Sequence, residues 1–178
     1  MALFGSVRDS NLFKSINREL LHNIIDTEVL VYQVNTEQTS YNFYGESDKM
    51  VYYTPTLIHA LVTVDDQTWT DSDFGLDVSQ TATFAFLKDD LVNNNIKPEP
   101  GDIVEYRSRF FELDSIIENQ LVAGKDPDNW FGGNSHGASM SIIYAAHMTR
   151  QSTLNIIPTR FGSNPPVTKQ STLPSNIW

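Results

Sequence analysis

Much of the chain between residues 28 and 148 consists of short segments in which apolar side chains recur at every second position. In 140–148, the clearest of them, the residues of one parity are Met140, Ile142, Tyr144, Ala146 and Met148. A period of two places such residues on one face of a β-strand. Alternation, or enrichment in β-branched and aromatic residues, also indicates strands at 28–34, 57–64, 81–87, 103–106 and 110–117. The pattern predicts a mainly β protein, either an antiparallel barrel or a sandwich.

One amphipathic helix is predicted before the first strand, over residues 10–25. Its apolar residues recur at spacings of three and four: Phe13, Ile16, Leu20, Leu21, Ile24 and Ile25. Ser10 or Asp9 can cap its N-terminus. We expect the helix to lie on the rest of the domain with this stripe covering the core. The alternative is that Phe13, Ile16 and Leu20 contact a neighbouring subunit.

Composition bounds the class of protein. The chain has 178 residues, no cysteine, and 22 acidic against 12 basic residues, for a formal net charge of −10. Such acidity argues against a basic nucleic-acid binder, and the lack of cysteine excludes disulfides and thiolate zinc sites. No segment has the length and apolarity of a membrane span or a signal peptide. We therefore expect one domain over 1–157, in the cytoplasm or in a structure assembled there, with no membrane partner.

The C-terminal segment 158–178 differs from the rest of the sequence. It carries four prolines, and the last 50 residues contain no acidic side chain but three basic ones, Arg150, Arg160 and Lys169. Prolines at this density oppose a helix, so we predict an extended arm. Ile177 and Trp178 would anchor the arm in an apolar pocket. Docking on a neighbouring subunit is the favoured interpretation, and folding back on the same domain is the alternative.

An acidic segment over 65–77 raises the question of calcium. Its carboxylates are those of Asp65, Asp66, Asp71, Asp73 and Asp77. The spacing lacks the glycine and the final glutamate of an EF-hand loop. We interpret the segment as a solvated acidic loop.

Catalytic and metal-binding patterns are weak. The histidines are His22, His59, His136 and His147, and no two have the spacing of a zinc motif. Ser135 precedes His136 without the flanking glycines of a nucleophile elbow. The sequence therefore predicts a structural protein rather than an enzyme, with no cofactor and no metal.

One stretch resembles a known family. The residues that carry the resemblance are Pro-Gly-Asp-Ile-Val-Glu-Tyr at 100–106, Phe-Phe-Glu-Leu-Asp at 110–114, Glu-Asn-Gln at 118–120 and Gly-Lys-Asp-Pro at 124–127. Together they resemble the neck proteins of tailed bacteriophages, and most closely the head-closure or stopper proteins of T4-like phages. The short connection Arg107-Ser108-Arg109 predicts a hairpin between the strands at 103–106 and 110–117, and it stands where the family has a glycine-bearing turn.

The resemblance implies a virion structural protein that connects head to tail. In such a neck, a homo-oligomeric ring of six or twelve copies stacks between the portal or adaptor and the tail proteins, and DNA passes through without specific binding. The acidic segment 65–77 would then face the channel, where an acidic wall would repel the phosphates of the sliding genome. In this picture Arg150, Arg160 and Lys169 face carboxylates of the next subunit.

Two alternatives remain open. Within the same class, the protein would be a tail-terminator, adaptor or baseplate component. In a different class, it would be a carbohydrate- or calcium-binding β-domain. Trp69 and Trp130 would then stack on a sugar, although packing under the loops is the simpler role for both.

Overall fold

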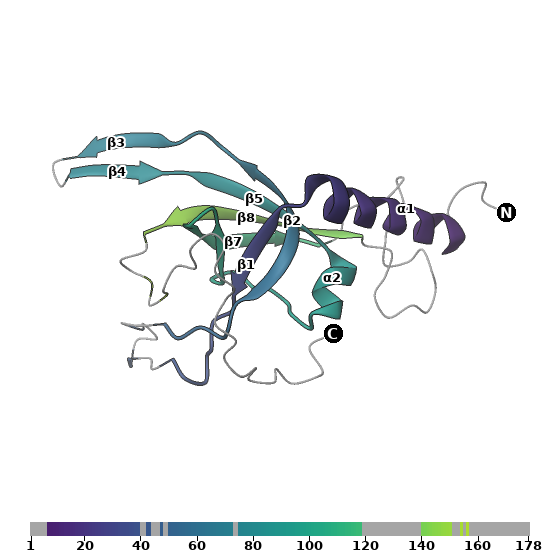
Figure 1. Cartoon of the computed structure of the whole chain (residues 1–178). Coiled ribbons are helices and arrows are strands. Elements are labelled where there is room, and N and C mark those ends of the chain that lie inside the picture. Colours follow the sequence, from purple (N-terminus) through teal and green to yellow (C-terminus); the bar gives the residue numbers. More distant parts are fainter. Residues whose placement is uncertain are drawn as a thin grey trace.

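The computed structural model describes residues 7–39, 42–43, 47, 50–72, 75–118, 140–150, 154 and 156; of 7–10, 70, 72 and 75–77 it describes only the backbone. The first described element is an α-helix that continues as a π-helical turn before the first strand (Figure 1). The helical elements are α1 (Val7–Glu19), η1 (Leu20–Ile25) and α2 (Lys88–Asn93). The strands are β1 (Glu28–Tyr32), β2 (Thr56–Val64), β3 (Thr68–Ser72), β4 (Gly75–Ser79), β5 (Thr81–Leu87), β6 (Ile103–Tyr106), β7 (Arg109–Ile117) and β8 (Ser141–Thr149).

Six of these strands close into an antiparallel barrel in the order β1-β2-β5-β8-β7-β6, with β6 pairing back onto β1. Closure pairs the edge strands, which would otherwise present free backbone donors and acceptors. The prediction of a mainly β protein with an N-terminal helix is confirmed. Of the two architectures predicted, the barrel and the sandwich, the barrel is the correct one. The predicted arm, 158–178, lies outside the described residues.

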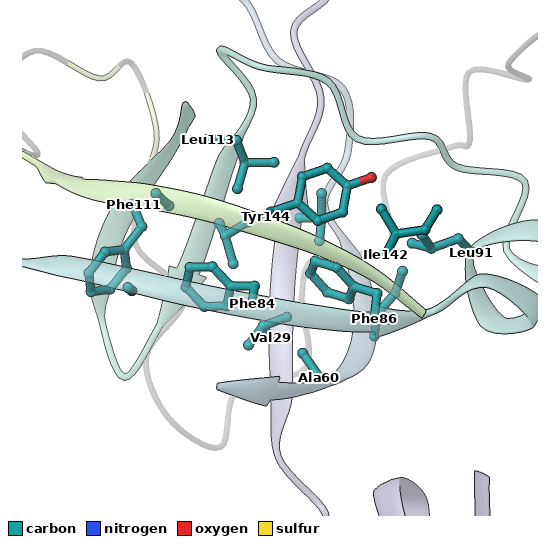
Figure 2. Packing of buried hydrophobic residues seen from close by; sticks show 14 of the residues in the cluster. Val29, Ala60, Phe84, Phe86, Leu91, Phe111, Leu113, Ile142 and Tyr144 are labelled. Carbon is teal, nitrogen blue, oxygen red and sulfur yellow. The ribbon is translucent and has the colours of Figure 1, made fainter. Parts of the chain in front are cut away.

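The barrel interior is filled by alternate residues of each strand; in β7 a bulge between Leu113 and Ser115 shifts the alternation, so that Phe111, Leu113 and Ile116 face the core. Phe84, Phe86 and Tyr144 are completely buried, and their rings lie together across β5 and β8 (Figure 2). The rings of Phe86 and Tyr144 meet edge to face at 5.5 Å, the geometry that aromatic quadrupoles favour. The hydroxyl of Tyr144 donates a hydrogen bond to the carbonyl of Pro98 at 3.2 Å. The period-two pattern of the sequence thus identifies the core face correctly.

A second apolar cluster covers the outer face of β1, β6 and β7. It consists of Leu30, Tyr32, Ile103, Phe110 and Ile156, with Tyr52 and Leu154 packed against it. Ile156 comes from the chain beyond β8, so the segment after the last strand returns to the barrel wall. Part of the outer barrel surface is therefore covered by described residues of the chain itself.

The β6–β7 hairpin contains the residues on which the family resemblance depends. Its turn is formed by Arg107 and Ser108, whose φ angles are 50° and 61°. Two successive positive φ angles are the signature of the type I′ turn, which matches the twist of the flanking strands. The predicted hairpin is confirmed, and Arg109 belongs to β7 rather than to the connection.

The acidic segment 65–77 was expected to be a loop, and that expectation is wrong. Most of it forms β3 and the start of β4, a two-stranded antiparallel ladder in which Trp69 pairs with Val78 and Thr70 with Asp77. β3 and β4 continue β2 and β5 beyond the barrel, so the ladder projects on the side away from α1 (Figure 1). Because β2 and β5 are already paired in the barrel, the segments that continue them, β3 and β4, are held side by side. This proximity favours strands there despite the acidic side chains.

Candidate assembly surface

The helix α1 is attached to the domain through its polar face. Lys14 Nζ lies 2.8 Å from Asp89 Oδ1, and Arg18 Nη2 lies 3.5 Å from Asp90 Oδ1. His22 Nε2 lies 2.7 Å from the second oxygen of Asp90, whose side chain is buried. Lys14, Arg18 and His22 recur at every fourth position and thus lie on one stripe of the helix. Both carboxylates belong to the first turn of α2, so one acidic turn holds the whole basic stripe.

The turn η1 adds a second attachment, to β2. The rings of His22 and His59 lie 4.3 Å apart, centroid to centroid, and His59 also faces Asp26 and Glu28 at 3.3 and 3.7 Å. Leu21 is buried at this junction. Among the described residues of α1 and η1, Leu21 is the only apolar side chain that is buried, so the helix contributes little to the core.

The apolar stripe of the helix is exposed. The fractional exposures are 58% for Leu12, 51% for Phe13, 51% for Ile16, 43% for Leu20 and 72% for Ile24. We call these five residues the helix stripe. The expectation that the predicted stripe would cover the core of its own domain is wrong for Phe13, Ile16, Leu20 and Ile24, because the ion pairs with Asp89 and Asp90 turn the helix the other way; Leu21 alone is buried among the predicted residues.

Helical geometry makes the two faces nearly opposite. Ile16 lies two residues after Lys14 and two residues before Arg18, and each offset is about 200° around the helix axis. Burying one Leu, Ile or Phe side chain is worth about 1.5–3 kcal/mol relative to leaving it exposed. Contact with a partner would therefore bury the helix stripe and gain a substantial free energy of apolar burial.

The acidic residues singled out from the sequence do not form one site. The carboxylate of Asp65 accepts a hydrogen bond from the hydroxyl of Thr81, and its backbone carbonyl accepts one from the side-chain amide of Gln80. Asp66 and Asp71 are exposed, only the backbone of Asp77 is described, and Asp73 lies outside the described residues. Within the described ranges, no three His, Asp or Glu side chains gather in a way that could hold a metal ion.

The basic and aromatic candidates fall mostly beyond the described chain. Arg150 is exposed directly after β8, while Arg160, Lys169, Ile177 and Trp178 lie outside the described residues. Trp69 is 59% exposed on β3, so it does not pack under a loop. Trp130, the proposed second sugar-stacking residue, also lies outside the described ranges. The three candidates that the structure brings together are thus Phe13, Ile16 and Leu20.

Sequence reasoning missed the residues that orient the helix. Asp89 and Asp90 were not singled out, although they are adjacent carboxylates at the start of a short helix. The available signal was a basic stripe, because Lys14, Arg18 and His22 recur at every fourth position. A basic stripe of this kind requires an acidic surface. The acidic partner of this stripe lies about 70 residues further along the chain, and the barrel topology determines its position beside the helix.

No model of a known protein family and no curated protein sequence matches this chain. None of the described helices has the length and apolarity needed to cross a membrane.

Proposed function

We propose that this protein is a structural subunit of a tailed-phage neck, in which copies form a ring between the head and the tail around the DNA channel. The observation that carries the proposal is the helix stripe, an exposed apolar surface on a helix that is nevertheless fixed to its own domain. Subunits of stable assemblies carry such patches, whereas isolated soluble domains rarely do.

The family resemblance supports the neck as the place of assembly. Its first two motifs fall on the turn before β6 and on the β6–β7 hairpin, which form one wall of the barrel. Gly101 has a φ of 96°, a conformation that favours glycine. Asp102 follows it and accepts hydrogen bonds from the backbone of Val34 and Glu99. These motif residues therefore build the barrel wall and leave contact with partners to other surfaces.

The charge distribution supports a passive relation to DNA. All 22 acidic residues precede residue 129, and that part of the chain carries a net charge of −13. A ring of such subunits repels phosphate, so a genome passes without being held. The head-closure position is proposed ahead of the tail-terminator, adaptor and baseplate positions because the resemblance is strongest there.

Oligomeric state tests the proposal directly. Electron microscopy and sedimentation of the purified full-length chain should show closed rings, and antibodies against it should label the neck of virions. A chain that stays monomeric at high concentration and is absent from virions would contradict the proposal. Calorimetry with glycans and with calcium tests the alternative, in which the exposed Trp69 would bind a sugar.

A further inference from the structure

The two-stranded β3–β4 ribbon projects from the barrel, and the strand pairing that would join the two is interrupted (Figure 1). The last barrel pair is Val64 with Ala82, and the first ribbon pair is Thr68 with Ser79. Three residues on one strand therefore oppose two on the other. An extra residue on one strand disrupts a ladder locally and bends it, as in a β-bulge. We call these five residues the ribbon base: 65–67, 80 and 81.

Side chains reinforce the backbone at the ribbon base. The backbone amide of Asp65 donates to the carbonyl of Thr81 at 3.0 Å, and the hydroxyl of Thr81 donates to the carboxylate of Asp65. The side-chain amide of Gln80 donates to the carbonyl of Asp65 at 2.8 Å. Gln80 is buried, and its own carbonyl accepts a hydrogen bond from the amide of Met148 on β8 at 2.8 Å. Gln80 is thus held by the barrel.

Arg109, the first residue of β7, reaches the ribbon base from a third strand. Its Nη1 donates to Oε1 of Gln80 at 2.8 Å. The side-chain oxygen of Gln67, with the amide oriented toward the guanidinium, accepts from Nη1 and Nη2 of Arg109 at 2.7 and 3.2 Å. A planar fork of donors is suited to bridging two acceptors in this way. Because Gln67 directly precedes β3, the guanidinium joins the ribbon to the barrel across the interruption.

We propose that Arg109 is a positioning residue that fixes the direction of the β3–β4 ribbon relative to the barrel. Without the guanidinium, the buried Oε1 of Gln80 and the oxygen of Gln67 lose their shared donor, and the ribbon swings about the bulged ribbon base. The ribbon carries the exposed Trp69, so a fixed ribbon presents this side chain at a defined place. The inference concerns a single copy of the chain and goes beyond the proposed function without resting on it.

A distance measurement between the ribbon and the barrel tests the proposal. Because the chain has no cysteine, Asp71→Cys on β3 and Ala145→Cys on β8, both exposed positions, can carry the only two spin labels. The labelled chain is diluted into an excess of unlabelled natural chain, so pulsed electron paramagnetic resonance reports distances within one copy. The labelled chain should give one narrow distance distribution. The same labelled chain with Arg109→Ala should give a clearly broader one.

Amide exchange gives a second measurement at the ribbon base. In Arg109→Ala the amide of Asp65 should exchange about 10-fold faster, because the backbone bond to Thr81 opens when the ribbon swings. Exchange in β5 and β8 should not change. This contrast separates movement of the ribbon from a general loss of stability.

Arg107→Ala is the matched control. Arg107 lies in the same turn and carries the same charge, but its guanidinium lies over the ring of Tyr106, 5.1 Å from the centroid. This variant should keep the narrow distribution and the slow exchange of Asp65. Equal broadening in Arg107→Ala and Arg109→Ala would overturn the proposal, since the charge of the turn would then be sufficient.

A double-variant comparison tests the bridge itself. Gln67→Ala removes the acceptor on the ribbon side and should also broaden the distribution. Because Gln67 is held through Arg109, the double variant should be no broader than Arg109→Ala alone. Additive broadening would show that the two side chains act separately and would overturn the bridge.

The remaining outcomes also decide the question. A narrow distribution in Arg109→Ala, or faster exchange throughout β5 and β8 with no change in the distribution, would overturn the proposal. If Arg109→Ala does not fold, Gln67→Ala carries the test, and a narrow distribution in that variant would overturn it. Ring formation is measured separately, so the proposed function stands or fails independently of these results.

Discussion

Asp102 shows how one buried side chain ties two distant segments together. It is 5% exposed, and its two carboxylate oxygens accept hydrogen bonds from the backbone N–H groups of Val34 and Glu99, both at 2.8 Å. Burial raises the pKa of Asp102 to about 6, and the two backbone donors, which favour the ionised form, offset only part of that effect.

The raised pKa of Asp102 predicts a pH-dependent stability. Its folded-state value, about 6, lies above the ordinary value of 3.8, so between them the folded state binds more protons than the unfolded state. This contribution is fully present below about pH 3.8 and is lost as the pH rises through 6. The loss is on the order of 3 kcal/mol of unfolding free energy. Urea unfolding from pH 4 to 7 should show it in the natural chain relative to Asp102→Asn, and parallel curves for the two proteins would contradict it.

The β6–β7 turn carries a conformational cost at Ser108. A non-glycine residue in the left-handed region is disfavoured by about 1–2 kcal/mol, and Ser108 has a φ of 61°. We expect Ser108→Gly to raise the unfolding free energy by about 1 kcal/mol, because the relief of strain exceeds the added freedom of the unfolded chain. Chemical denaturation measures the change. Ser108→Ala keeps the Cβ atom and should give no gain; an equal gain in both variants would point to another cause.

At the scale of elements, α1 is an amphipathic helix whose polar side faces its domain. Asp90 is central to that arrangement, because its buried carboxylate contacts both Arg18 and His22. We expect Asp90→Ala to release α1 without unfolding the barrel. Amide exchange in 11–25 should accelerate about 10-fold, corresponding to roughly 1.4 kcal/mol, and exchange in β5 and β8 should not change.

A matched control for this change is Lys14→Ala. The pair of Lys14 with Asp89 is partly exposed, and such pairs are worth about 0–1 kcal/mol. Its effect on exchange in α1 should therefore be smaller than that of Asp90→Ala. Equal effects would show that the carboxylate of Asp90 has no special part in holding the helix.

The elements also show what sequence can and cannot predict here. The barrel strands were predictable because Phe84, Phe86 and Tyr144 follow the period that a buried face imposes. The orientation of α1 was not, because it depends on Asp89 and Asp90, whose position beside the helix follows from strand pairing distant in sequence.

At the scale of the whole molecule, charge opposes assembly. Each copy carries a net charge of −10, so neighbouring copies repel one another. Salt shortens the range of this repulsion, from about 30 Å at 0.01 M to about 10 Å at 0.1 M, and apolar contacts do not lose strength in that range. We therefore expect rings to form at lower protein concentration as salt is raised between these values. Sedimentation of a dilution series measures this, and dissociation of the rings by added salt would show instead that ion pairs hold them together.

The segment that follows the barrel offers a second test at this scale. Ile156 packs on the outer face of β1, β6 and β7, so a chain ending at 157 keeps both apolar clusters. We expect this truncated chain to fold with unchanged thermal stability and to lose assembly, because the apolar residues Ile177 and Trp178 that would anchor the arm are removed. Normal ring formation by the truncated chain would remove the arm from the assembly.

The ion pairs that hold α1 to α2 also bear on how fast subunits join. A segment that becomes ordered only on binding must lose its conformational entropy during the encounter, and association is then slowed or weakened. Here Lys14, Arg18 and His22 hold the helix in place in the isolated subunit. Growth of the assembly should therefore follow simple second-order kinetics in subunit concentration, with no slow unimolecular step before each addition.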